Sequence, residues 1–441
     1  MPILTTIARS VQSLLGPLAE EVATAVPVVQ RKRKFSPATL ARTFILGFLA
    51  KPNASEKDLA RTAARCGVLV TPKAVEQRYT DTMVTFLETL FRKAICQRVQ
   101  ADRTLAPLVE RFPTVRLLDS TSITLPAELG DRFPGCGGSY GGGQAAMKLQ
   151  VQLDLRHGTL DAVSIEAGKD CDQRTPLQSA PMPEGGLRIT DLGYFDTQVL
   201  QDLHARGGFW ISRLAFGTEI LTPEGKPITR IEDLFAASTR VVDRQVLVGK
   251  QAKLPCRIVI WRVPQEVADR RRQKLIATAR DKGNPPPSRE RLAWCNWTIF
   301  VTNVPSDLLS PEEIGVLYRA RLQIELMFKR WKSLGRIADL TGATVTEQLV
   351  RLWSRLLAMV VQHWLLLACA WGDLRCSLYQ GGATIREYTN DLIRVLDNLE
   401  ELTQELRRIE QVLQKVARRD KRKQPGTFEL LNDPSLLGYE S

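Results

Sequence analysis

The chain has 441 residues, of which 44% are hydrophobic and 25% charged, the proportions of a soluble globular protein with room for two or three domains. Its 61 lysines and arginines exceed its 48 acidic residues, giving a formal net charge of +13 that favours a polyanionic partner, nucleic acid before an anionic membrane surface. Three histidines and eight cysteines without a C-x-x-C pair do not favour a zinc site or a histidine-based catalytic triad.

No targeting or membrane-spanning segment is evident. The first stretch, residues 1–29, lacks the basic start and solid apolar run of a secretory signal. The most apolar stretch, residues 356–371, is shorter than a membrane span and contains Gln362 and His363, so we expect a buried core helix there. Scattered cysteines indicate a reducing compartment, and we expect a cytoplasmic protein without a membrane partner.

Residues 1–112 are expected to be helical. After the basic run 31–34, Ser36 and Pro37 form a typical helix start, and a second helix is expected from Ser55 to Gly67. A third helix is predicted from Pro72 through residue 95. A short helix, a tight turn and a helix with basic and amide side chains near its start fit a DNA-binding helix-turn-helix, although a plain helical bundle gives the same pattern.

Residues 113–216 predict a mixed α/β sheet. The apolar strand 115–119 ends in Asp119 and the strand 187–191 ends in Asp191. Between them, residues 147–168 alternate as a hairpin that turns at His157-Gly158, and residues 172–178 allow a short helix. The glycine-rich segment 135–143 lacks the G-K-[ST] ending of a phosphate-binding loop, so we expect a flexible loop. A helix at 197–207 and a strand at 209–216 complete the alternating pattern.

The remaining chain is predicted to hold a β-rich insertion and then helices. Residues 217–303 contain short β runs around a charged helix that Asn284 and three prolines end. Residues 346–371 form a buried helix, and residues 383–423 one long, basic helix. Residues 425–441 are expected to be loose.

A helix predicted for residues 311–337 carries a polar stripe. At ~100° per residue, the side chains that fall within ~60° of one another are those of Tyr318, Arg321, Glu325 and Lys332, with Lys329 beside them. The opposite arc is apolar, as in a helix packed from behind. Ordinary pairing between acidic and basic side chains on a solvated helix explains such a stripe equally well.

Three acids could meet to hold metal ions. Asp119 and Asp191 each end an apolar strand, and strands of one sheet bring such side chains together, while Glu325 reaches in from a packed helix. Mg²⁺ prefers oxygen ligands, and two ions ~3.5–4 Å apart activate an attacking oxygen and stabilise a leaving one. Either acid alone at a strand end is more often a solvated turn residue. The three acids together predict phosphoryl-transfer chemistry.

At these residues the sequence resembles a known family. Tyr318-x2-Arg321-x3-Glu325-x6-Lys332 is similar to the Y-R-E-K signature of the DDE transposases of the insertion-sequence-four family. The segments 119–126 and 190–196 resemble the first and second catalytic blocks of that family, and the resemblance covers roughly residues 113–335.

The resemblance implies a fold and an activity. It implies a ribonuclease H-like mixed sheet, interrupted by a β-rich insertion and flanked by N-terminal and C-terminal helical regions. Asp119, Asp191 and Glu325 would bind two Mg²⁺ or Mn²⁺ ions. Water would cut the terminal inverted repeats of an element, and the 3′-OH ends would attack target DNA, in a synaptic homodimer. Cut-and-paste members can pass through a hairpin, and the location would be the bacterial cytoplasm, at the nucleoid.

The resemblance also implies roles for basic and aromatic residues. Arg321, Lys329 and Lys332 would grip phosphates near the scissile bond, and Tyr318 would hydrogen-bond a phosphate. In relatives that form hairpins, an aromatic residue before the Glu-bearing helix stacks on a flipped base, which would be Trp297 here. A core position in an alternating strand is the other interpretation of Trp297, and Trp294 lies close in sequence.

We therefore expect a DNA transposase made of five regions. These are an end-binding region (1–112), the first part of the catalytic core (113–216), the insertion (217–303), the second part of the core (304–373) and a basic C-terminal region (374–441). The alternatives are a nuclease of the same fold that never joins ends, a non-catalytic DNA-binding regulator derived from a transposase, and a basic helical scaffold. The repeat sequence, the target preference, the second-strand chemistry and the activity of this copy are not encoded in any readable pattern.

Overall fold

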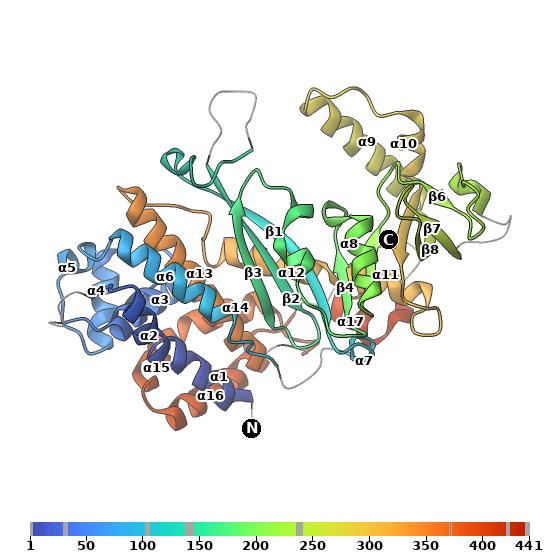
Figure 1. Cartoon of the computed structure of the whole chain (residues 1–441). Helices are drawn as coiled ribbons and strands as arrows, with labels where there is room; N and C mark the ends of the chain where they lie inside the picture. The colour runs from blue at the N-terminus through green and yellow to red at the C-terminus, as the bar shows by residue number, and fades with distance from the viewer. Residues whose placement is uncertain are drawn as a thin grey trace. The chain divides into compact units, whose positions relative to one another are not determined.

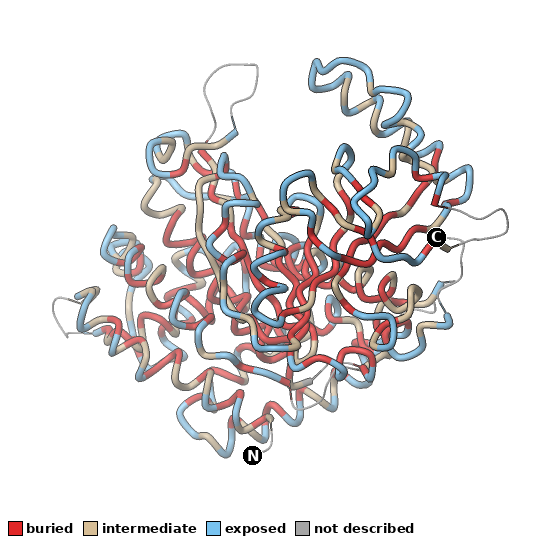
Figure 2. Tube along the Cα trace, turned by 45° about the vertical axis from the view of Figure 1, so that its right-hand side comes forward, coloured by how far each residue is buried: buried red, intermediate tan, exposed pale blue. Residues whose placement is uncertain are grey.

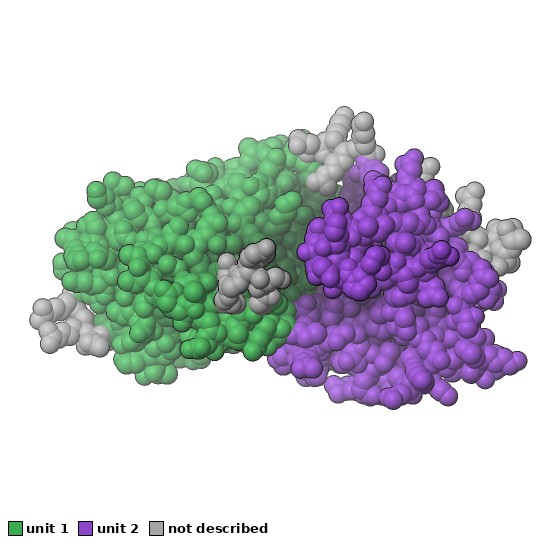
Figure 3. Space-filling model, turned by 90° about the horizontal axis from the view of Figure 1, so that it is seen from above, with its two compact units in different colours: residues 1–105, 119–170, 323–422 green, residues 106–118, 171–322, 423–441 purple. Residues whose placement is uncertain are grey.

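Two compact units make up the chain (Figure 3). Unit 1 comprises residues 1–105, 119–170 and 323–422, and unit 2 comprises residues 106–118, 171–322 and 423–441. The computed structural model describes residues 3–29, 34–101, 106–136, 145–234, 241–369, 371, 373–419 and 424–436. Each unit is described by itself below.

Helices dominate unit 1 (Figure 1). They are α1 (Ile3–Leu14), α2 (Pro17–Ala25), α3 (Pro37–Ala50), α4 (Glu56–Arg65), α5 (Pro72–Glu76), α6 (Asp81–Ile95), α12 (Leu322–Ser333), α13 (Val345–Cys369), α14 (Leu378–Glu387), α15 (Thr389–Val395) and α16 (Leu399–Val416). Helix α13 is the centre of the unit, because α1, α3, α6, α14 and α16 all pack against it. Every residue from 349 to 367 is buried (Figure 2), which confirms the predicted core helix.

Two predicted helix starts are confirmed by their caps. The Ser36 hydroxyl accepts a hydrogen bond from the Thr39 amide and opens α3, and Ser55 accepts one from the Asp58 amide and opens α4. Each side chain satisfies an amide that the first helical turn leaves without a partner. Gly67, with φ at 81°, follows α4 in the left-handed region that suits glycine.

Two long helices predicted in unit 1 are shorter helices in the structure. Residues 72–95 form α5 and α6, because Thr80 adopts an extended backbone and its hydroxyl caps α6 by accepting from the Met83 amide. Residues 383–423 were expected to form one helix, but α14, α15 and α16 occupy the described part. Asn398 starts α16 by accepting bonds from the Glu400 and Glu401 amides. At Thr80 and at Asn398 a single capping side chain outweighs the helical periodicity around it.

Unit 1 also holds the second part of β1 (Val115–Thr124) and the hairpin of β2 (Ala146–Asp154) and β3 (Leu160–Ala167), in the order β3-β2-β1. Strands β2 and β3 are antiparallel, and Gly158 turns between them with φ at 71°, as predicted. Strand β1 does not end at Asp119 as predicted. It continues to Thr124 because Thr121 and Ile123 bury alternate side chains. The segment 137–143 of the glycine-rich loop lies outside the described residues.

Unit 2 is built on a mixed sheet. Its strands are the first part of β1, β4 (Leu187–Thr190), β5 (Phe209–Arg213), β6 (Ile220–Leu221), β7 (Val241–Val248), β8 (Leu254–Arg262) and β9 (Trp297–Thr302). Their order is β1-β4-β5-β9-β8-β7-β6, in which β1, β4 and β5 are parallel and the pairs from β5 onward are antiparallel. The parallel strands are mostly apolar and buried, as is usual for parallel strands, although the buried Arg116 and Arg188 interrupt the apolar runs. The predicted mixed α/β class is confirmed.

The helices of unit 2 are α7 (Pro107–Glu110), α8 (Thr197–Ala205), α9 (Gln265–Asp281), α10 (Arg289–Trp294), α11 (Pro311–Ala320) and α17 (Thr427–Asn432). Three short 3₁₀ turns, at Asp172–Arg174, Pro176–Ser179 and Leu192–Tyr194, occupy the polar segment and the residues after β4. The helix α17 corrects the prediction of a loose tail. It packs against α7 and α11, because Phe428, Leu430 and Leu431 are fully buried.

In the part of the chain that the structure describes, no helix combines the length and the hydropathy needed to cross a membrane.

Candidate active site

Asp119 lies in the middle of β1, where the strand passes from full to partial burial. Residues 115–118 are buried, Asp119 and Ser120 are half-buried, and the Ser120 amide donates to Asp119 Oδ1 over 2.9 Å. The buried stretch fixes the strand, and partial burial leaves the carboxylate accessible. The strand therefore presents an anchored acid at a surface, which is what a metal ligand requires.

Glu325 reaches the same surface from α12. The buried side chains of this helix include Ile324, Met327, Phe328 and Trp331. The other face carries Glu325, Lys329 and Lys332, spaced i, i+4 and i+7. An open pocket of about 480 Å³ is lined by Asp119, Ser120, Thr121, Glu325, Phe328, Lys329, Lys332 and Ser333. Unit 1 thus brings two of the three predicted acids together with two of the predicted cations.

Helix α12 is anchored just beyond its C-terminal end. Gly335 lies against α13, and a Cβ there would come within 2.6 Å of the Met359 side chain. The Arg355 guanidinium, 1% exposed, donates from Nη1 to the Arg336 carbonyl over 3.0 Å and also to the Asp339 carbonyl. Its Nε donates to the Pro52 carbonyl over 2.8 Å. Burial lowers the pKa of Arg355 to about 10, which leaves it a cation at neutral pH.

Arg351, one turn earlier on α13, ties the same helix to the start of α4. It donates to the Ala54 carbonyl over 2.9 Å and pairs with Glu56 at 2.5 Å and with Glu347 at 2.8 Å. Two neighbouring arginines thus bind the turn between α3 and α4, and one of them also holds the segment that follows the Glu325 helix. Buried guanidinium groups with several partners are strong local constraints.

Asp191 and its partners belong to unit 2. Asp191 directly follows β4, as predicted, and its side chain is 46% exposed. The Tyr318 hydroxyl donates to Asp191 Oδ1 over 3.2 Å, and Arg321 Nη2 lies 4.0 Å from the same oxygen. The Tyr318 ring packs against Phe300, with ring centroids 4.7 Å apart. Burial, with the Asp191 charge, raises the pKa of Tyr318, so its hydroxyl stays protonated and donates.

The predicted single helix 311–337 is two helices. The Arg321 amide bonds to the Tyr318 carbonyl, a three-residue spacing that ends α11, and α12 begins at Leu322. Tyr318 lies on α11, whereas Glu325, Lys329 and Lys332 lie on α12. The predicted polar stripe is therefore divided between two helices, and the helical spacing relates side chains only within α11 or within α12.

The oxygen atoms of the side chains in the acid pocket and around Asp191 are ligands that suit a hard divalent cation. Carboxylate and hydroxyl oxygens line them, without cysteine or histidine, and Mg²⁺ is commonly bound by one or two carboxylates plus substrate phosphates. Among the described residues, no group of three or more acidic, histidine or cysteine side chains lies close enough to hold a metal ion. Asp119 and Glu325 belong to unit 1, and Asp191 belongs to unit 2.

Trp297 lies in the apolar core of unit 2. It is 8% exposed and clusters with Ile258, Ile260 and Ile299, which agrees with the core interpretation of this strand residue. Trp294 is only partly buried, and its ring meets the ring of Phe216 edge-on with centroids 5.5 Å apart. A base-stacking role for Trp297 stays a prediction, and Trp294 is the more accessible of the two tryptophans.

Sequence reasoning missed the residues that support these side chains. Arg257, 2% exposed on β8, pairs with Asp243 at 2.6 Å and donates to the Leu309 carbonyl over 2.7 Å, next to the Ser310 cap of α11. The lone arginine within the apolar run 256–261 was a usable signal for a buried ion pair. Arg351 and Arg355 gave a similar signal, because they lie in a mostly apolar part of α13.

Comparison with known proteins places these residues in a family. A family model described as the transposase DDE domain matches residues 110–361, more than half of the chain. The chain belongs to the transposase DDE domain family. The matched range contains Asp119, Asp191 and Glu325. The chain is therefore an enzyme that cleaves DNA and transfers strands, and the family implies dependence on a divalent metal ion. Membership also confirms the predicted ribonuclease H-like fold class.

Curated relatives match between two thirds and nearly all of the chain. The chain is 27% identical to the transposase for insertion sequence element IS231B of Bacillus thuringiensis subsp. berliner, over 91% of this chain and 89% of the relative. It is 27% identical to that for IS231E of Bacillus thuringiensis subsp. finitimus, over 95% and 93%. It is 25% identical to that for IS1151 of Clostridium perfringens, over 66% and 65%.

Proposed function

We propose that this chain is an insertion-sequence transposase of the insertion-sequence-four family, with Tyr318, Arg321, Glu325 and Lys332 as its Y-R-E-K signature. It cuts double-stranded DNA at the terminal inverted repeats of its element and joins the ends to target DNA. In the first step, water attacks the phosphodiester and releases a 3′-OH. In the second step, that 3′-OH attacks a target phosphodiester, forms the new bond and releases a target 3′-OH.

Asp119, Asp191 and Glu325 are the ligands of two divalent ions, Mg²⁺ or Mn²⁺, in this proposal. Bound there, the ions supply activation of the attacking oxygen and stabilisation of the leaving one. The Tyr318 hydroxyl fixes the orientation of the Asp191 carboxylate, since it donates to Oδ1. A ligand held by an outer hydrogen bond needs less reordering when it binds.

The cations bind and orient the DNA. Lys329 and Lys332 line the pocket of Asp119 and Glu325, so a phosphate that reaches these carboxylates also meets two ammonium groups. Arg321 lies beside Asp191 and can donate to a phosphate with two parallel N–H groups. These contacts offset the repulsion between the phosphate and the acids.

The remaining regions serve DNA binding and assembly. We assign residues 1–112 to recognition of the element ends, with α4 and α5 as a helix-turn-helix-like pair, although α5 has only five residues. The basic C-terminal region, which includes Arg418 and Arg419, binds DNA or joins two copies into the synaptic homodimer. The place of action is the bacterial nucleoid.

One observation supports the proposal most. Asp119 and Glu325 are more than two hundred residues apart in sequence, and both line one open pocket with two lysines, inside the matched range. Solvated surface acids would not be expected to share a pocket with the cations of the same motif.

Cleavage and joining of end DNA test the proposal. The substrate is a labelled duplex that carries the inverted repeat found beside the coding region, with Mg²⁺ and a supercoiled target plasmid. We expect the wild-type chain to nick the repeat and join it to the plasmid. Asp119→Asn, Asp191→Asn and Glu325→Gln should each abolish both products and retain binding of the duplex.

Two results would contradict the proposal. Cleavage without joining, even with pre-cut ends, would identify a stand-alone nuclease of the same fold. Binding without cleavage by the wild-type chain in either Mg²⁺ or Mn²⁺ would favour a non-catalytic DNA-binding regulator.

A further inference from the structure

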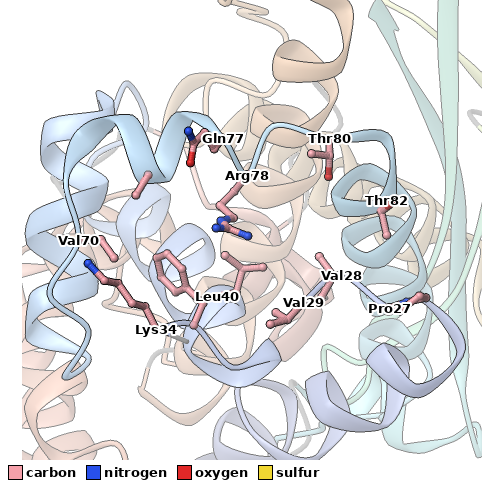
Figure 4. Close-up of a pocket in the computed structure, with 12 residues that line it drawn as sticks. Pro27, Val28, Val29, Lys34, Leu40, Val70, Gln77, Arg78, Thr80 and Thr82 are labelled. Carbon is pink, nitrogen blue, oxygen red and sulfur yellow. The ribbon is translucent and has the colours of Figure 1, made fainter. Parts of the chain in front are cut away.

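A second concave site lies in unit 1, among the N-terminal helices (Figure 4). It is a cleft of about 530 Å³ bordered by the segment after α2, the start of α3 and the connection between α5 and α6. None of the residues that line it belongs to the acid-bearing pocket. Its volume falls in the range of about 300–1,000 Å³ typical of sites for small organic ligands.

The floor of the cleft is apolar. It is formed by Val28 and Val29 after α2, by Phe35 and Leu40 around the start of α3, and by Val70 before α5. Phe35 and Leu40 are almost fully buried, at 4% and 0% exposed, so they support the floor from behind, and the apolar surface open to a ligand is mainly that of the half-buried Val28, Val29 and Val70. A phenyl ring and aliphatic side chains suit a flat ring or a sugar, because stacking and apolar contact need no matching hydrogen bonds.

The rim of the cleft carries hydrogen-bond donors. They are the side chains of Lys34, Gln77, Arg78, Thr80 and Thr82, and the described lining contains no acidic residue. Figure 4 shows the Arg78 guanidinium over the middle of the cleft, near Leu40. The surroundings are therefore cationic and rich in donors, which suits an anion.

Arg78 is the rim residue whose charge and hydrogen-bond donors are best placed to hold a ligand. Among the described residues its Nε has no hydrogen-bond partner, and its guanidinium lies 5.8 Å from the centroid of the Phe35 ring. No ion pair joins Arg78 or Lys34 to a carboxylate within the described part of the chain. The charge of both side chains is therefore available to an anion. In sequence, Lys34 ends a run of four basic residues, 31–34.

We propose that this cleft binds one phosphate-bearing nucleotide. The phosphate is held by Arg78 and Lys34, and the base or sugar lies on Phe35 and the valines. A phosphate of intact duplex DNA would need the donors but not the apolar floor, so the combination indicates a nucleotide outside the base stack. The inference rests on the proposed function for the source of the nucleotide, a DNA strand of the element end. A free nucleotide offers the same chemistry.

Photocrosslinking of the full-length chain tests this site. The probe is a short single-stranded oligonucleotide in which thymine is replaced by 5-iodouracil, whose irradiation joins it to a neighbouring aromatic side chain. We expect the crosslinked peptide to contain Phe35. Arg78→Gln should lower the yield of the crosslink about tenfold or more, because it removes a charge-assisted hydrogen bond to the phosphate. The matched control, Arg280→Gln at an exposed position of α9 in unit 2, should change the yield less than about twofold.

Further arms separate the possible sources and keep the test decisive. Val29→Trp fills the floor without changing charge and should also abolish the crosslink, and Arg78→Lys should restore part of the yield. Suppression by thymidine 5′-monophosphate would mean that a free nucleotide suffices, whereas persistence would assign the cleft to a DNA strand. Crosslinks confined to residues outside 27–40 and 70–82, or an unchanged yield in Arg78→Gln, would overturn the proposal. The crosslink needs no cleavage, so its failure is distinct from failure of the transposase reaction.

Discussion

At the scale of single residues, the hydrogen bond between Tyr318 and Asp191 gives the tyrosine a definite task. The hydroxyl lies 3.2 Å from the carboxylate oxygen, and burial keeps it protonated. The resemblance predicts that Tyr318 hydrogen-bonds a phosphate of the DNA, and that role stays a prediction. The structure shows a contact with a candidate metal ligand, made across 127 residues of sequence.

Replacing this hydroxyl should weaken catalysis without weakening DNA binding. We expect Tyr318→Phe to lower end cleavage by about 10–100-fold, the usual cost of losing an outer partner of a metal ligand, and to raise the Mg²⁺ concentration needed for half-maximal rate. The matched control is Tyr79→Phe, another partly buried tyrosine that donates to a carboxylate, Glu56. An equal loss in both variants would show that the effect is only on folding.

Lys332, one of the two lysines that line the acid pocket, should contribute to the salt dependence of DNA binding. Lys332→Gln should reduce the slope of log affinity against log salt by about 0.9, one phosphate contact. Lys226→Gln, an exposed position in a turn of unit 2, is the control. Measured by fluorescence anisotropy, an unchanged slope for Lys332→Gln would exclude a phosphate contact there.

His363 should make stability depend on pH. Burial lowers the pKa of this side chain to about 4, although it donates to the Gly158 carbonyl over 2.7 Å. Because the unfolded pKa is near 6.5, the unfolded chain binds the proton more tightly, and stability should fall as pH drops from 6.5 to 4, by about 3 kcal/mol from this group. Urea unfolding of His363→Gln should show a flatter pH profile in this window, whereas the exposed His204→Gln should retain the wild-type profile. A wild-type slope in His363→Gln would contradict the assignment.

At the scale of elements, α12 matters because its end is fixed to α13. Helical spacing predicted which face carries Glu325, and the pocket confirms that Glu325, Lys329 and Lys332 share a face. The break at Arg321 and the breaks at Thr80 and Asn398 were not predictable in this way. They depend on single caps and on tertiary contacts that helical periodicity does not contain.

Gly335 packs so closely against α13 that a larger residue at this position should destabilise the chain. A Cβ would lie 2.6 Å from Met359 and 2.7 Å from the Trp331 carbonyl oxygen, so Gly335→Ala should cost about 1–3 kcal/mol of unfolding free energy by overpacking. Cleavage should fall further than stability explains, because the displaced helix carries Glu325. Leu326→Ala, a change at an exposed position of the same helix that does not line the acid pocket, is the control. The unfolding free energy and the cleavage rate should be measured on the same samples. If Gly335→Ala had wild-type values of both, the close contact between Gly335 and α13 would be refuted.

At the scale of the whole molecule, the three acids are divided between two compact units. Asp119 and Glu325 belong to unit 1, and Asp191 belongs to unit 2 with Tyr318 and Arg321. The sequence was sufficient for the class of fold and for the order of most strands along the chain, because apolar runs are local, whereas the identity of the acids as metal ligands stays a prediction. The sequence was not sufficient for the supporting arginines on α13 or for the folded tail at α17, which depend on partners far away in sequence.

The most direct test of the central claim, that the three acids bind one set of metal ions, is affinity cleavage of the protein. Fe²⁺ replaces Mg²⁺ in the full-length chain bound to end DNA, and ascorbate with peroxide produces radicals that cut the backbone next to the bound iron. We predict cuts near residues 119, 191 and 325 together, all suppressed by excess Mg²⁺ and by Glu325→Gln. Cuts near 119 and 325 that never include 191, or cuts that Mg²⁺ does not suppress, would contradict the account.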